Sequence, residues 1–128
     1  IVYVENTGSK AVYVRVKLSP EWSGDLPNVV TIADEDYVMA DFPILDGWEY
    51  YEGWYYYKNP LAGAAAGEPN PVTTHLIEKV IFAGAAMTND YQGATFTLKV
   101  EAEAVQASHE AYKDEWGTDI TFLTPYIP

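Results

Sequence analysis

Apolar and polar residues alternate strictly over Ala94–Ala104, within the predicted strand Ala94–Gln106, and this is the clearest structural signal in the chain. Every second position from Ala94 to Ala104 is apolar, and the positions between them carry Thr, Lys or Glu. Because the side chains of an extended strand point alternately to opposite faces, this period of two predicts a β-strand with one apolar face. We expect the apolar face to contribute to the core, and the polar face to lie in solvent or against a neighbouring subunit.

The same alternation occurs near the N-terminus, at Val2 and Val4 and again over residues 12–18. The stretch between these runs, residues 6–9, reads Asn-Thr-Gly-Ser and has the composition of a turn. Two alternating runs joined by a short turn are typical of two paired antiparallel strands. The pattern therefore predicts a β-hairpin over residues 1–18.

Shorter runs predict the remaining elements. The apolar runs Val29–Ala33 and Leu76–Ala83 are bounded by polar or turn-forming residues and predict two further strands. The stretch Ser108–Trp116 predicts a short helix, with Ser108 as its N-cap and Gly117 directly after its end. Strands therefore dominate, and the one helix lies near the C-terminus.

Aromatic residues occupy seven of the ten positions in Trp48–Tyr57. Rings pack well on a pleated surface, so this segment predicts two strands separated by Glu52-Gly53. If the alternation continues through the turn, one face carries Trp48, Tyr50, Trp54 and Tyr56 and the other carries Tyr51, Tyr55 and Tyr57. We expect one set to face the core. The tyrosine set is then a candidate for packing within the chain, for subunit contact or for stacking on a sugar.

Several short strands with turns between them and one helix predict an all-β fold, a jelly-roll-like β-sandwich with one short helix near the C-terminus. The chain has 128 residues, which is the usual size of one domain. The loop over residues 60–71 is rich in Ala, Gly and Pro, but it is too short for a domain linker. We therefore expect a single β-sandwich domain over residues 1–128.

The charge balance excludes one class of partner. The chain carries 19 acidic and 7 basic residues, giving a net charge of −12, and it has no basic cluster. Nucleic-acid binding needs several Lys or Arg side chains to neutralise phosphates, so we expect no nucleic-acid partner. No apolar run approaches the roughly 20 residues of a membrane-spanning helix, so we expect no membrane insertion. The absence of cysteine excludes disulfides and thiolate chemistry.

Candidate catalytic groups are sparse, and we expect no enzymatic activity. The two histidines, His75 and His109, have no partner at metal-ligand spacing, and no Gly-x-Ser-x-Gly sequence is present. The best candidate for cation binding is the acidic run Asp34, Glu35 and Asp36. Calcium prefers several oxygen ligands from a flexible loop, so this run predicts either a Ca²⁺ site or a solvated acidic loop.

The order of the motifs resembles the TasA/camelysin family, exported proteins of Gram-positive bacteria that a dedicated signal peptidase processes. The similarity covers most of the chain, and four motifs carry it. These are the Asn-Thr-Gly-Ser turn with the alternating run that follows it (residues 4–18), Gly-Trp-Tyr-Tyr-Tyr-Lys-Asn-Pro-Leu (53–61), Leu-Ile-x-x-Val-x-Phe (76–82), and the alternating run 91–107 with Ala-x-x-x-x-Trp-Gly (111–117) downstream.

This resemblance implies a jelly-roll sandwich and a secreted, cell-surface or biofilm-matrix protein. It also implies that subunits join into fibres when each donates an N-terminal strand to the next. Family members carry the donor strand before the Asn-Thr-Gly-Ser turn, whereas this sequence starts at Ile1. Either that segment has been removed or this member differs from the family; if it has been removed, we expect the domain to have an unfilled edge or groove.

The resemblance and the scarcity of catalytic groups favour a non-enzymatic structural subunit of an extracellular fibre or biofilm matrix. Its expected partner is another copy of itself, through strand exchange, with glycans or other matrix proteins as further candidates. Two alternatives stay open. One is a surface carbohydrate- or host-binding module that uses Tyr51, Tyr55 and Tyr57. The other is a camelysin-like metalloprotease, for which the sequence offers no triad of metal ligands.

Overall fold

A computed structural model describes residues 1–84, 87 and 89–128. It is 38% strand and 12% helical, its sheets are antiparallel, and its one α-helix is short and close to the C-terminus, which confirms the all-β class. The elements in chain order are β1 (Val12–Trp22), η1 (Ser23–Asp25), β2 (Val29–Ile32), β3 (Glu35–Val38), β4 (Ala40–Asp41), β5 (Trp48–Tyr51), β6 (Trp54–Tyr57), β7 (Ile81–Phe82), η3 (Asn89–Tyr91), β8 (Phe96–Gln106), η4 (Ser108–Glu110) and α1 (Ala111–Glu115).

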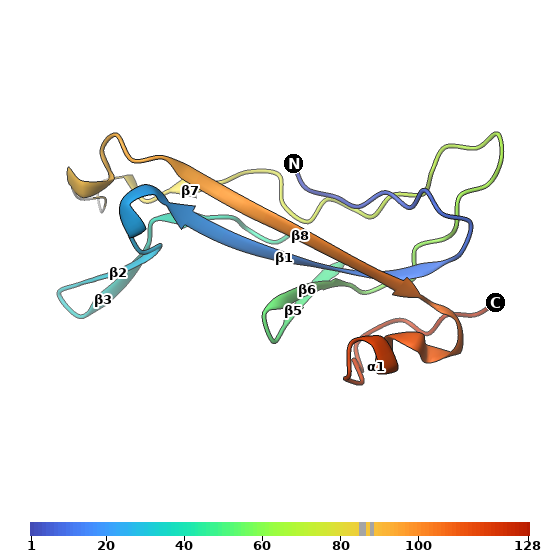
Figure 1. Ribbon diagram of the computed structural model, residues 1–128. Helices are drawn as coiled ribbons and strands as arrows, with labels where there is room; N and C mark the ends of the chain where they lie inside the picture. Colours follow the sequence, from blue (N-terminus) through green and yellow to red (C-terminus); the bar gives the residue numbers. More distant parts are fainter. Residues whose placement is uncertain (85–86, 88) are drawn as a thin grey trace.

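The main sheet has four antiparallel strands in the order β5-β6-β1-β8 (Figure 1). Its two long strands, β1 and β8, pair along their whole length, from Val12 opposite Gln106 to Trp22 opposite Phe96. Two smaller pairs accompany it, the hairpin β2–β3 and the short pair β4–β7. The strands predicted over Ala94–Gln106 and Val29–Ala33 are therefore present; β8 begins two residues later than predicted, and β2 ends one residue earlier.

One face of the main sheet is covered by extended segments, residues 1–5 and 72–77 (Figure 1). Val14 and Val16 on this face are almost completely buried, with 1% and 0% of their surface exposed. They belong to a core cluster whose other buried members are Trp48, Tyr57, Leu76 and Ile77. This cluster joins the sheet to a second layer of chain, as a sandwich requires.

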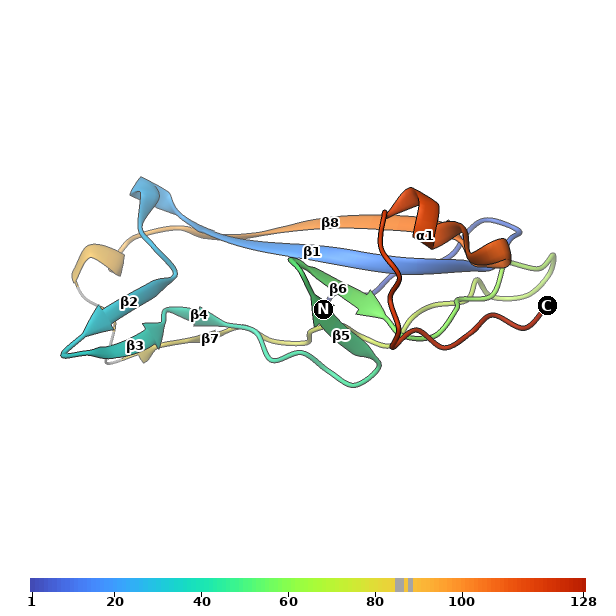
Figure 2. The same ribbon diagram turned by 90° about the horizontal axis from the view of Figure 1, so that it is seen from below.

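The opposite face is covered at one end by η4, α1 and the C-terminal tail (Figure 2). Its buried residues are Tyr13, Tyr56, Val105, Ala107, Tyr112, Ile120 and Leu123. The Tyr13 hydroxyl donates a hydrogen bond to the carbonyl oxygen of Thr124 at 2.7 Å, which fixes the tail against β1. A third cluster, around Trp22 and Met39, closes the far end of the sheet near β4 and η3.

Arg15, the only arginine of the chain, connects β1, β8, β6 and α1. Its guanidinium lies 4.2 Å from the centre of the Trp54 ring and 4.6 Å from that of Trp116. Its Nε donates to Glu103 Oε1 at 2.8 Å, and its Nη1 donates to the Tyr56 hydroxyl at 3.1 Å. A planar cation between two rings with a carboxylate at its edge is a strongly favourable arrangement, so Arg15 holds the C-terminal helix on the sheet.

The hairpin predicted over residues 1–18 is wrong. The N-terminal segment pairs instead with residues 72–77, through bridges that join Val2 to Ile77 and Glu5 to Val72. The turn at residues 6–9 leads into β1, and the run before it packs over the face of the sheet instead of pairing beside β1. Its conformation depends on Asn6, whose side-chain amide donates to the carbonyl oxygens of Lys10 and Ala62 at 2.9 Å each.

Two other boundaries also differ from the expectation. Within Leu76–Ala83 the structure has only the two-residue strand β7 and the isolated bridge at Ile77, because the pairing partner changes from the N-terminal segment to β4 along this stretch. The predicted helix is present as η4 followed by α1, and Gly117 has the expected left-handed φ of 68° after its end. Ser108 is not an N-cap, since the residue that precedes η4 is Ala107 and no side chain caps either turn.

Candidate functional site

The strand β8 lies at an edge of the main sheet and is the candidate functional site. In the described part of the chain it pairs only with β1, so its outer edge is unpaired over 11 residues. Figure 2 shows β8 along one long side of the molecule, with β1 on its inner side. Natural proteins usually shorten, cover or interrupt such edges, because unpaired backbone groups readily recruit another strand.

Hydrogen bonds at the two ends of the β1–β8 ladder show which backbone groups face outward. The Ala107 N–H donates to the Ala11 carbonyl at 2.9 Å, and the Ser23 N–H donates to the Thr95 carbonyl at 2.9 Å. Since successive residues of an antiparallel strand direct their backbone groups to alternate sides, the odd-numbered residues of β8 bond to β1. The outward-facing backbone groups belong to Phe96, Leu98, Val100, Ala102, Ala104 and Gln106.

The apolar side chains at the middle of β8 are also exposed. Phe96 and Leu98 are half-buried, but Val100 exposes 47% of its surface, and Ala102 and Ala104 are exposed as well. The expectation that this apolar face lies in the core is therefore wrong over residues 100–104. The physical reason is that the covering segments pack on the Val14 and Val16 side of the sheet and leave the edge strand uncovered.

The predicted set Tyr51, Tyr55 and Tyr57 does not share a face. Residues that pair directly across a hairpin point to the same face, and Tyr51 pairs with Trp54 whereas Trp48 pairs with Tyr57. Across the two-residue turn at Glu52 and Gly53, odd-numbered residues of β5 therefore share a face with even-numbered residues of β6.

The consequence is that the three tyrosines have different surroundings. The Tyr51 ring lies 6.3 Å from that of Phe122 on the α1 side, Tyr57 is buried in the core opposite, and Tyr55 lies 5.0 Å from the more exposed Tyr50. Burial raises the pKa of the Tyr55 phenol above 10.0, and the nearby Tyr50 and Asp41 add to the shift. A binding role for the three tyrosines stays a prediction.

The acidic residues Asp34, Glu35 and Asp36 lie at the tip of the β2–β3 hairpin. Ala33 and Asp34 form the turn with φ of 53° and 67°, and Glu35 and Asp36 are the first residues of β3. Because neighbouring residues of a strand point to opposite faces, their carboxylates diverge. In residues 1–84, 87 and 89–128, no three acidic or histidine side chains come together as metal ligands, and the Ca²⁺ site stays a prediction.

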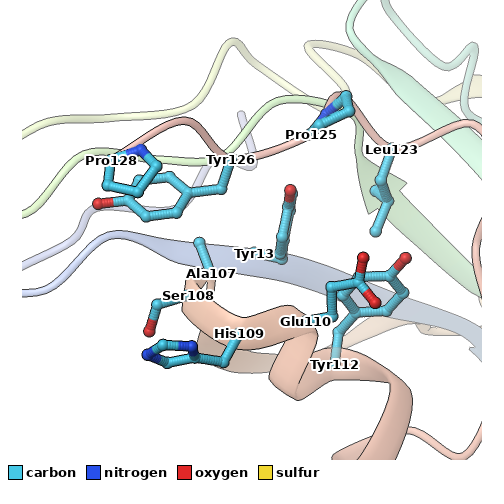
Figure 3. Close-up of a pocket in the computed structure, with 10 residues that line it drawn as sticks. All are labelled: Tyr13, Ala107, Ser108, His109, Glu110, Tyr112, Leu123, Pro125, Tyr126 and Pro128. Carbon is cyan, nitrogen blue, oxygen red and sulfur yellow. The ribbon is translucent and has the colours of Figure 1, made fainter.

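A cavity of about 500 Å³ lies between η4, α1 and the C-terminal tail (Figure 3). Its lining includes Tyr13, Tyr112 and Tyr126, and Glu110 points toward it. The Tyr112 hydroxyl donates to Asp119 Oδ1 at 3.1 Å, and the Glu110 carboxylate forms an ion pair with Lys113 Nζ at 2.6 Å. The polar groups at this cavity therefore hold the C-terminal segment in place, and we assign it no catalytic role.

Comparisons with protein-family models, with curated proteins and with solved structures found no match. In the described residues, no helix has the length and apolar character needed to cross a membrane. The site that the structure adds to the sequence analysis is the exposed middle of β8. Its sequence signal is the pair of small residues, Ala102 and Ala104, on a strand face that would carry larger side chains if it were buried in a core.

Proposed function

We propose that the protein is a non-enzymatic structural subunit of an extracellular fibre or biofilm matrix, and that it belongs to the TasA/camelysin family that its motifs resemble. In this proposal the β8 edge accepts a strand donated by a second copy. The observation that carries the proposal is the 11-residue unpaired edge, whose outward-facing backbone groups belong to the same residues as its exposed apolar side chains.

Strand addition uses both features of this edge. The backbone N–H and C=O groups of Leu98, Val100 and Ala102 would pair with the incoming strand, and these main-chain hydrogen bonds give affinity. The exposed side chains on the same residues would contact every second side chain of that strand, which sets its register. An added strand would thus cover apolar surface that is exposed in the single chain.

The added strand would extend the main sheet, which is one layer of the proposed jelly-roll sandwich. The four-stranded sheet would form one layer, and the segments at residues 1–5 and 72–77, together with β4 and β7, would contribute to the other. The core cluster around Val14 and Val16 already joins the two layers. The family resemblance places the donor N-terminal to the domain of the neighbouring subunit.

Proline at position 102 tests this proposal. Ala102→Pro removes an outward-facing N–H but no hydrogen bond to β1, so the fold should tolerate it as edge strands tolerate proline. We expect electron microscopy of the mature protein to show fibres for the wild type and for the control Ala102→Ser, which keeps the N–H. Fibre mass should fall at least about tenfold for Ala102→Pro, the effect of about 1.4 kcal/mol per added strand.

Two outcomes would contradict the proposal. If Ala102→Pro forms fibres as readily as the wild type, with an unchanged urea midpoint, the β8 edge is not the assembly site. If the mature wild type stays monomeric across pH and ionic strength, the protein is not a fibre subunit.

A further inference from the structure

The side chains on the exposed face of β8 are complementary to one another about Val100. Two residues before Val100 is Leu98 and two residues after it is Ala102; four residues away in each direction are Phe96 and Ala104. Each pair joins a large side chain to a small one. If two copies of β8 paired antiparallel around Val100, every large side chain would therefore lie opposite an alanine of the other copy.

The charged residues have the same complementarity. Lys99 precedes Val100 and Glu101 follows it, so the same pairing puts Lys99 of each copy opposite Glu101 of the other. Opposite charges directly across an antiparallel pair are stabilising, and like charges are destabilising. Lys99 can change its partner to Glu101 of the other copy, because its intramolecular ion pair with Glu21 is long, at 3.7 Å, and both side chains are more than half exposed.

The backbone supports this register, and charge distinguishes it from its neighbours. The outward-facing groups belong to even-numbered residues, and pairing around Val100 brings even-numbered residues opposite each other, so that the groups on both strands can bond. A centre at Glu101 would place two glutamates opposite each other, and a centre at Lys99 would do the same with two lysines. A centre at Ala102 would place Glu101 opposite Glu103. A centre at Leu98 brings no like charges together, but it places Lys99 opposite Thr97 and so loses both Lys99–Glu101 contacts.

We propose that two copies of the chain pair through their β8 edges, antiparallel and centred on Val100, when no donor strand occupies the edge. The two sheets then join into one continuous sheet around a two-fold axis, and the interface is closed because each copy uses the same surface. The pairing occupies the edge to which a donor strand would add, so the dimer and fibre growth exclude each other. That competition rests on the proposed function, whereas the dimer itself does not.

Single cysteines locate the two-fold axis without interference, because the chain has none of its own. In the proposed dimer the two Val100 Cα atoms are about 5.5 Å apart, which is within disulfide range. Val100→Cys should form a disulfide-linked dimer under mild oxidation. The matched control is Ala104→Cys on the same strand face, whose two copies are about 26 Å apart, eight residues along the strand, and should not cross-link. Equal cross-linking of the two variants, or none with Val100→Cys, would overturn the proposal.

Charge reversal tests the register. Lys99→Glu and Glu101→Lys each place like charges opposite each other in a homodimer, and each should raise the dimer Kd at least about tenfold in sedimentation analysis. A mixture of the two variants restores opposite charges in every pair and should recover the wild-type Kd. A mixture that associates no better than either variant alone would exclude this register.

The dimer and the fibre have separate readouts. Fibres from a wild type that stays monomeric at concentrations up to about 1 mM would overturn the dimer and leave the proposed function intact. A dimer without fibres under any condition would overturn the proposed function and leave the dimer intact. If both occur, Lys99→Glu should accelerate fibre growth, because it removes the competing pairing; unchanged growth would exclude the competition.

Discussion

Gly63 shows how a single residue fixes the path of the N-terminal turn. A Cβ at this position would lie 2.3 Å from the Ser9 carbonyl oxygen and 2.9 Å from the Lys10 nitrogen, so only glycine allows the two stretches of backbone to approach this closely. The neighbouring Asn6 amide spans the same gap, donating to carbonyl oxygens on both sides of it. The turn and the loop after β6 are therefore one packed unit.

Gly63→Ala should lower the free energy of unfolding by about 2–3 kcal/mol, because the added methyl group forces backbone apart. The matched control is Gly8→Ala in the same unit. Its Cβ would meet only the Asn6 Oδ1, at 3.4 Å, and we expect a change below about 1 kcal/mol. Urea unfolding followed by tryptophan fluorescence measures both. Equal midpoints for the two variants would show that the close approach is not required.

At the scale of elements, the contacts of Arg15 compensate for the shortness of α1. A helix of five residues is not stable by itself, since helix nucleation is costly. Arg15 holds it through the Trp116 ring while it bonds to Glu103 on β8 and Tyr56 on β6. The helix is therefore stable only while the strands beneath it are paired.

Arg15→Gln should release the C-terminal segment without unfolding the sheet. Loss of the ring contacts and the charged hydrogen bond should weaken this docking by roughly 1–3 kcal/mol. Hydrogen exchange of the α1 amides should then accelerate about tenfold or more, which is the effect of 1.4 kcal/mol. The β1–β8 amides should be little affected. Lys17→Gln, which removes a cation 5.8 Å from Trp54, is the control and should leave α1 protected. Equal acceleration in both variants would contradict a specific role for Arg15.

At the scale of the whole molecule, net charge opposes association while the open edge favours it. Each copy carries a net charge of −12, which keeps copies apart at low ionic strength. Salt screens this repulsion beyond about 10 Å at 0.1 M and affects paired backbone groups much less. The proposed pairing through the β8 edge therefore has to overcome this repulsion, which salt reduces.

Alkaline pH should destabilise the whole fold. Burial raises the pKa of the Tyr13 and Tyr112 phenols above 10.0, and at Tyr112 the hydrogen bond to Asp119 adds to the shift. The folded state thus holds these protons more tightly than the unfolded chain does. Their contribution is fully present below pH 10 and is lost as the pH rises through the folded-state pKa values. We expect the urea midpoint to fall between pH 10 and 11, and Tyr112→Phe, which cannot ionise, to fall less steeply. Equal slopes would contradict this assignment.

Local patterns predicted the elements in which neighbouring residues determine the conformation. The alternation from Ala94 to Ala104 identified β8, and the aromatic segment identified β5 and β6 on either side of Glu52-Gly53. Gly117 ended the helical stretch as expected. These features depend on side-chain alternation and on turn residues, both of which can be read from the sequence.

Pairing partners could not be predicted in the same way. Val2 pairs with Ile77 rather than with the neighbouring run, and the turn at Glu52 exchanges the faces of the tyrosines. Both depend on hydrogen-bond register between segments. Register is a property of two paired segments, and a shift of one residue moves every side chain of the shifted strand to the opposite face.

The sequence by itself determined that β8 is a strand and that one of its faces is apolar. Only the tertiary structure decided that this strand lies at the sheet edge, with Val100 exposed and the backbone groups of the apolar residues directed outward. The alternation is identical for a central strand and an edge strand, because it reports the direction of side chains and not what lies beside them. The number of neighbours that a strand has is decided by how the rest of the chain folds around it.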